Sequence, residues 1–158
     1  MWYNIFPSAF GEILVVGDDQ AIEILNFQNS TSPHPVDPAW RRDTALFGET
    51  RQELEAYFAG ELQEFSMSVA PRGTEFQREV WQALREIPYG KLATYRDIAQ
   101  RIRRPNAVRA VGAANGANPV AVVVPCHRVI GSNGTLTGYA GGLEIKERLL
   151  QLEGSLML

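Results

Sequence analysis

A chain of 158 residues, 45% apolar and 21% charged, has the length and composition of one globular domain or of two small ones that share a core. Its single cysteine, Cys126, excludes a disulfide within the chain and a zinc site built from several thiolates. Since no apolar run approaches the roughly 20 residues of a membrane span, and the first residues lack the pattern of a signal peptide, we expect a cytoplasmic protein without membrane contact.

Charge is unevenly distributed along the chain. Residues 1–71 carry a net charge of −8, residues 72–109 a net charge of +5, and residues 110–158 a net charge of 0. An acidic first part followed by a basic segment suggests a nucleic-acid-binding face in the second part. Charge alone leaves a solvated helical surface as an equally good explanation.

The start of the chain predicts a small antiparallel sheet. Residues 11–16 and 21–27 are rich in β-branched and other apolar residues, and the turn at residues 17–20 makes them a hairpin. Residues 30–38 contain three prolines and predict a loop.

A helix and a change of character follow. Apolar spacing over residues 44–58 predicts a helix that ends at Gly60, and residues 65–69 form a candidate last strand. Charge and element type both change at residues 70–73. We therefore expect an N-terminal domain over residues 1–71 and a C-terminal domain over residues 72–158.

The C-terminal domain is expected to be mostly helical. Thr74 caps a predicted helix that ends before residues 88–90, and Thr94 opens the next one. A turn at residues 103–106 leads to a third helix over residues 107–117, so the last two helices have the pattern of a helix-turn-helix or of an ordinary helical hairpin. The predicted fold class is α/β (α+β), with the small sheet and its helix joined to a winged-helix-like domain.

The rest of the chain surrounds the cysteine. A valine-rich run, residues 120–124, leads directly into Pro125-Cys126-His127-Arg128. Residues 131–142 contain five glycines and predict a loop, and residues 143–153 predict a final helix that ends at Gly154.

The Cys126-His127 pair is the candidate reactive centre. Thiolate is the nucleophilic form of cysteine, and a neighbouring base favours it. Adjacent residues of a strand point to opposite faces, so the two side chains can cooperate only if the chain turns, which Pro125 makes plausible. Glu147 is a candidate partner for the imidazole, although a surface pairing with a lysine or arginine explains it as well. The same Cys-His dipeptide is compatible with a hydrolase, but no residue here specifies the acyl or thioester site that a hydrolase needs.

The helix at residues 107–117 contains mainly Ala, Gly and Val, with Arg109 as its one long cation. A smooth helix can enter the narrow minor groove of DNA and insert one side chain into the base stack. Tight helix packing would use the same small residues.

These residues together resemble a known family. Pro125-Cys126-His127-Arg128-Val129-Ile130-Gly131 is similar to the active-site signature of O6-alkylguanine-DNA alkyltransferases, also called methylated-DNA–protein-cysteine methyltransferases. The resemblance covers about residues 74–154, and its other marks follow in order: Thr94-Tyr95, Arg109-Ala110-Val111-Gly112, Asn118-Pro119, Gly138-Tyr139-Ala140-Gly141-Gly142-Leu143 and Lys146-Glu147.

The resemblance implies a role for each matching position. Cys126 accepts the alkyl group, His127 deprotonates it through a water molecule, and Glu147 orients His127. Tyr95 donates a proton to the departing guanine, Asn118 braces the active-site turn, and Arg109 replaces the flipped nucleotide. The implied DNA-binding surface also includes Thr94, Arg96, Ala110, Ala113, Ala114 and Arg128. The implied substrate pocket contains Val129, Tyr139, Ala140 and Gly141.

The implied reaction is a single displacement at a base extruded from double-stranded DNA, approached from the minor groove. It requires no metal or organic cofactor, and its thioether product has no easy leaving group, so each chain acts once. The resemblance further implies a monomer, with cooperative assembly on DNA left open. A non-catalytic, alkyltransferase-like protein that only binds the lesion is the alternative, although members of that class lack the acceptor cysteine.

The chain departs from the family pattern in several places. Some relatives hold zinc in the N-terminal domain, whereas this half has no cysteine and only His34, so we expect no zinc. Ala140 stands where many relatives have serine, and Asn115 and Gly116 are unusual on the recognition helix. These differences bear on the breadth of the pocket and on DNA affinity.

Overall fold

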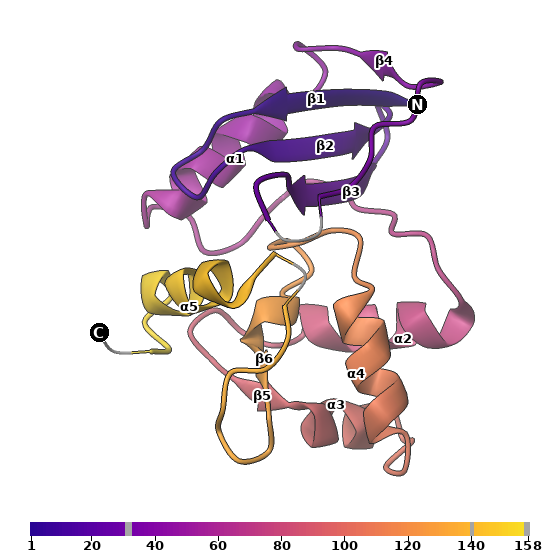
Figure 1. Ribbon diagram of the computed structural model, residues 1–158, viewed down its shortest axis with the longest axis vertical. Helices are drawn as coiled ribbons and strands as arrows, with labels where there is room; N and C mark the ends of the chain where they lie inside the picture. The colour runs from indigo at the N-terminus through magenta and orange to yellow at the C-terminus, as the bar shows by residue number, and fades with distance from the viewer. Residues whose placement is uncertain (31–32, 140, 157–158) are drawn as a thin grey trace.

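A four-stranded sheet is built from the first 42 residues (Figure 1). The computed structural model describes residues 1–30, 33–139 and 141–156. The strands β3 (Ile22–Phe27), β2 (Ile13–Gly17) and β1 (Trp2–Phe6) are antiparallel neighbours, and the short β4 (Arg41–Arg42) pairs with β1 in parallel. The predicted hairpin of β2 and β3 is confirmed. The predicted antiparallel sheet is corrected to a mixed one, since β1 and the parallel β4 were not predicted.

The helix α1 (Gly48–Phe58) begins later than the predicted residue 44. A carboxylate oxygen of Asp43 accepts hydrogen bonds from the backbone N–H groups of Ala45 and Leu46, and this local turn competes with a helix start. The predicted strand at residues 65–69 is wrong. The backbone N–H groups of Ser66 and Met67 donate to the carboxylate of Glu53, and only Val69 forms an isolated bridge, to Ile22.

Three helices form the body of the C-terminal half, and the first two start where the sequence predicts. Thr74 and Thr94 each form a capping box at the helix start. The helices are α2 (Glu75–Arg85), α3 (Tyr95–Arg101) and α4 (Val108–Gly116). The three pack against one another, and Trp81 Nε1 donates a 2.8 Å hydrogen bond to the carbonyl of Ala114 on α4. The helix-turn-helix of α3 and α4 is therefore present. Beside it, β5 (Ala93–Thr94) and β6 (Val129–Ile130) form a small parallel pair.

The last helix, α5 (Leu143–Leu152), lies between α1 and the helical half (Figure 1). A second contact joins the halves along β3, where Leu25 accepts a hydrogen bond from Ala121 and donates one to Pro119. A single hydrophobic core contains residues from both halves. No helix in the described ranges is long and apolar enough to cross a membrane.

Candidate active site

A tight turn carries the cysteine. Cys126–Arg128 forms a 3₁₀ turn in which the backbone N–H of Arg128 donates to the carbonyl of Pro125 at 3.0 Å. The turn required for cooperation between the thiol and the imidazole is therefore present. Before it, Asn118 Nδ2 donates to the carbonyls of Val124 at 2.8 Å and Val120 at 3.3 Å, while Asn118 Oδ1 accepts from Val120 N. These bonds hold the valine run that leads into the turn of Cys126.

Cys126 is 5% exposed and lines a cavity between the two halves of the chain. Burial raises the pKa of the thiol, while the Asn118 side chain and the Lys146 ammonium act in the opposite direction. The resting cysteine is therefore a neutral thiol that needs a base. The cavity is lined by Leu25, Asn26, Phe27, Asn115, Gly116, Asn118, Ala121, Cys126, Gly138, Tyr139 and Gly141.

The N-terminal half contributes directly to this cavity, which the sequence did not predict. Three lining residues belong to β3, which is held beside the active-site segment by the hydrogen bonds of Leu25. Hydrophobic alternation identifies β3 as a strand, but it does not say which chain segment lies along its edge. The cavity beside the cysteine is therefore shared by the two halves of the chain.

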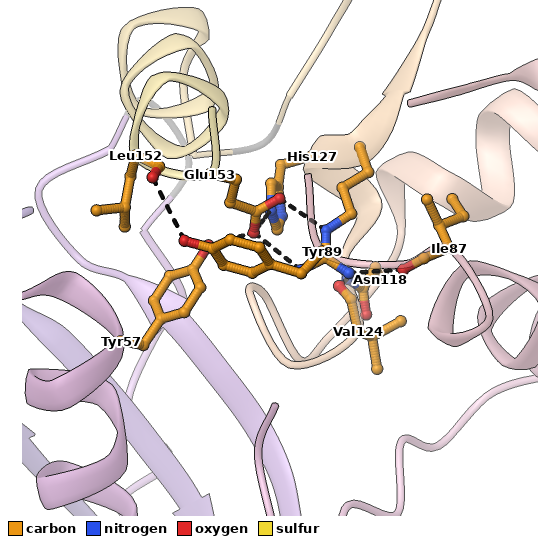
Figure 2. A network of polar contacts seen from close by, with 9 residues as sticks. Tyr57, Ile87, Tyr89, Asn118, Val124, His127, Leu152 and Glu153 are labelled. Atoms are coloured by element: carbon orange, nitrogen blue, oxygen red, sulfur yellow. Dashed lines mark hydrogen bonds and ion pairs between the residues drawn. The ribbon is translucent and has the colours of Figure 1, made fainter. Parts of the chain in front are cut away.

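One buried carboxylate organises the polar groups behind the cysteine (Figure 2). Glu153 caps the C-terminal end of α5. Its Oε2 lies 2.9 Å from His127 Nε2 and accepts from Arg128 Nη2 at 2.9 Å, and its Oε1 accepts from Arg128 Nε at 2.8 Å. Tyr57 of α1 donates its hydroxyl to the same Oε2. Burial would raise the pKa of Glu153, but the hydrogen bonds from His127, Arg128 and Tyr57 outweigh it and lower the pKa to about 2.

Glu147, the predicted partner of His127, is exposed and takes no part in this network. The buried face of α5 contains Ile145, Leu149 and Leu150, and the helical repeat continues that face to Glu153, whereas Glu147 points away. The signal for Glu153 was thus available in the sequence: it lies four residues after Leu149, just before the Gly154 stop.

His127 is held as a neutral base. Burial lowers the pKa of its imidazole, and the opposing effect of Glu153 does not restore it. Because Nε2 faces a carboxylate, that nitrogen carries the proton and Nδ1 keeps its lone pair. Within residues 1–30, 33–139 and 141–156, the buried Nδ1 atom has no hydrogen-bond partner. It is therefore the atom suited to accept a proton.

A buried lysine ties the glycine-rich loop to the turn. Lys146 Nζ donates to the carbonyls of Val129 at 2.6 Å and Thr137 at 2.8 Å. Burial lowers the pKa of this lysine to about 8, against the opposing effect of Cys126. Thr137 also bonds to the predicted acid, since its Oγ1 lies 3.0 Å from the hydroxyl of Tyr95. The sequence motif includes Lys146, but it does not show which groups the lysine side chain contacts.

The predicted pocket residues are only partly found together. Tyr139 and Gly141 line the cavity, and the Tyr139 hydroxyl is buried without a hydrogen-bond partner among the described atoms. Val129 is fully buried, with its carbonyl bonded to Lys146, and does not line the cavity. Ala140 lies outside the described residues.

The predicted DNA-binding residues fall into two groups. Arg96, Arg109, Ala110 and Ala113 are exposed on α3 and α4, and Thr94 is half-buried as the cap of α3. Two predictions are wrong. Ala114 is 4% exposed because it packs on α2, and Arg128 is 7% exposed because its guanidinium bonds Glu153 and the carbonyl of Ile87.

The low pKa of Glu153 predicts acid sensitivity. A carboxyl whose pKa is about 2 in the folded chain and about 4.5 when unfolded stabilises the fold fully above pH 4.5. We expect about 3 kcal/mol of unfolding free energy to be lost as the pH falls from 4.5 towards 2. Urea unfolding followed by tryptophan fluorescence at each pH measures the loss. Glu147→Gln should lose the same unfolding free energy as the wild type over this pH range. If the unfolding free energy of both proteins did not change with pH, the low pKa of Glu153 would be contradicted.

Two family models together span nearly the whole chain. Residues 1–71 match the ribonuclease-like domain of 6-O-methylguanine DNA methyltransferase, and residues 75–155 match the DNA binding domain of the same family.

Curated relatives and a solved structure agree with these matches. A methylated-DNA–protein-cysteine methyltransferase of Methanosarcina acetivorans is 54% identical, over 98% of this chain and 99% of that one. A protein of the same name from Haemophilus influenzae is 45% identical, over 97% of this chain and 86% of that one. The crystal structure of Mycobacterium tuberculosis OGT in complex with DNA matches with a TM-score of 0.91 and 45% identity, over 98% of this chain and 94% of that chain.

Proposed function

The chain belongs to the 6-O-methylguanine DNA methyltransferase family, and we propose that this DNA repair alkyltransferase moves the alkyl group of O6-alkylguanine irreversibly onto Sγ of Cys126. The observation that best supports this proposal is a buried neutral thiol next to a histidine whose Nε2 is fixed by Glu153 and whose Nδ1 keeps its lone pair. The lesion-binding alternative is not favoured, since the acceptor cysteine is in place and the curated relatives are named as methyltransferases.

The proposed step is a displacement at the alkyl carbon. His127 Nδ1 takes the thiol proton through a water molecule, and the thiolate attacks the alkyl carbon. The bond from that carbon to O6 breaks, its electron pair goes to the base, and the Tyr95 hydroxyl supplies a proton so that neutral guanine leaves. The product is a thioether on Cys126, which does not reverse, so each chain acts once and uses no cofactor.

The target base lies inside duplex DNA and must be extruded before the thiol can reach it, at a cost of about a few kcal/mol of stacking. We propose that α4 enters the minor groove, where its small residues allow close approach, and that Arg109 fills the gap left by the flipped nucleotide. Exposed Arg96, Ala110 and Ala113 extend this surface, with Thr94 at its edge. We propose a cytoplasmic monomer with residues 1–71 and 72–158 as its two domains.

Mass measurement of the acceptor peptide tests this function. The protein is incubated with duplex DNA that contains one O6-methylguanine, and the tryptic peptide bearing Cys126 is weighed. We expect one methyl group per chain and no turnover beyond one equivalent. Tight binding with an unmodified peptide would instead indicate a lesion-binding protein.

Arg109→Ala is expected to slow repair of duplex DNA by about tenfold while leaving reaction with free O6-methylguanine unchanged, because only the duplex needs a base to be flipped. Single-turnover rates on both substrates measure the difference. Arg51→Ala, an exposed arginine of α1, is the matched control and should change neither rate. Equal losses on both substrates for Arg109→Ala would contradict insertion into the duplex.

A further inference from the structure

Tyr57 of the N-terminal half donates a hydrogen bond to the proposed catalytic network. Tyr57 lies in α1, is fully buried, and donates its hydroxyl to Glu153 Oε2 at 2.5 Å, across 96 residues of sequence (Figure 2). Its ring packs edge-on against Tyr89 and contacts Phe58 and Phe65. The hydroxyl is therefore fixed in direction by packing on several sides.

Oε2 of Glu153 serves three groups at once. It faces His127 Nε2, and it accepts from Arg128 Nη2 and from the Tyr57 hydroxyl. Donors on one oxygen share its electron density, so each weakens the attraction that the oxygen exerts on the others. Arg128 also bonds Oε1, whereas Tyr57 bonds only the oxygen that faces the histidine.

We propose that Tyr57 is a positioning residue for alkyl transfer: its hydroxyl donates to the oxygen of Glu153 that faces His127 and thereby reduces the negative charge that this oxygen presents to the imidazole. The inference rests on the proposed function, in which His127 is the base. Without this donor, Oε2 would bind the protonated imidazole more strongly, and His127 would spend more time in the form that cannot accept a proton.

Tyr57 stays a donor under all relevant conditions. Burial, together with the adjacent Glu153, raises the pKa of its hydroxyl, so it does not ionise. Other groups act on His127 besides the Tyr57 contact to Glu153. The charged groups that act on His127 are Glu153, Arg128 and Lys146, while Tyr89 and Tyr139 interact with Glu153 rather than with the imidazole.

The test compares Tyr57→Phe with Tyr89→Phe. Both variants remove one hydroxyl from the same aromatic cluster, but the Tyr89 hydroxyl donates to the carbonyl of Leu152 and not to the carboxylate. Single-turnover methyl transfer from duplex DNA is measured from pH 5 to 9. For Tyr57→Phe we expect the acid limb of the pH–rate profile to shift to higher pH by about half a unit, with an unchanged rate on the plateau. At pH values on the acid limb, this shift is about a threefold loss of rate. Tyr89→Phe should match the wild type.

A second readout needs no activity. The chain has only two histidines, His34 and His127, so the imidazole NMR signals are simple to assign. In Tyr57→Phe we expect the Nε2 proton of His127 to move downfield as its bond to Oε2 strengthens, with His34 unchanged. Replacing Tyr57 with 3-fluorotyrosine adds one small atom to the ring and makes the hydroxyl a stronger donor, so we expect a folded protein in which both readouts move in the opposite direction.

The outcomes separate the inference from the proposed function. The positioning role would be overturned if folded Tyr57→Phe kept the acid limb and the Nε2 signal of the wild type. If Tyr57→Phe does not fold, the same result in the fluorotyrosine protein would overturn it. A wild-type chain that transfers no methyl group would overturn the proposed function, and the NMR comparison would still decide the role of Tyr57.

Discussion

Replacing Cys126 with serine is expected to lower alkyl transfer on the order of 10³-fold or more, while binding to lesion-containing duplex DNA is retained. A serine hydroxyl is a far weaker acid than a thiol, and the neutral His127 cannot ionise it to a useful extent. The two side chains are nearly the same size, so the turn and the cavity should keep their shape. Peptide mass and a gel-shift titration measure transfer and binding on the same sample.

Cys126→Ala is the matched control for this experiment. It also removes the nucleophile but adds no hydroxyl, so both variants should bind alike and neither should carry a methyl group. A methyl group found on any other residue of either variant would show that the acceptor has been misassigned.

Glu153→Gln is expected to have the second largest effect, on both activity and stability. The change leaves Arg128 buried without a charge partner and removes the carboxylate that holds the His127 tautomer. Breaking a buried pair in this way costs about 3–5 kcal/mol of unfolding free energy. Loss of the oriented base should slow transfer by about 10²-fold, measured on the folded fraction at low temperature.

Glu147→Gln is the control, since it makes the same chemical change six residues earlier on the exposed face of α5. Its rate and its urea midpoint should equal those of the wild type. If Glu147→Gln were the slower variant, the hydrogen bonds of Glu153 would be structural only, and Glu147 would be the residue that orients His127.

Local signals in the sequence predicted the starts of α2 and α3 and the hairpin of β2 and β3. Thr74 and Thr94 begin helices because each satisfies orphan backbone N–H groups together with a polar residue three positions later. The hairpin of β2 and β3 follows in the same way from a short polar turn between apolar runs. Such features depend on neighbours in the chain, so the sequence contains them directly.

Features that depend on distant residues were missed. The sequence favours Glu147 as the partner because it lies beside apolar positions, but the choice between Glu147 on α5 and Glu153 at its C-cap depends on what packs against each face. The resemblance places Arg128 at the DNA surface, and nothing nearby in the sequence shows that Glu153 neutralises its charge. Residues 65–69 have a strand pattern, yet the backbone N–H groups of Ser66 and Met67 donate to the Glu53 carboxylate instead of to a neighbouring strand.

Burial of Cys126 has a consequence for a protein that can be used only once. A thiol that is 5% exposed and whose pKa is raised by burial offers little thiolate to small electrophiles that diffuse past it. Reagents that alkylate DNA in a cell would otherwise consume the acceptor before it met a lesion. The burial that makes the cysteine depend on a base therefore also keeps the protein unalkylated until the substrate that fits the cavity binds.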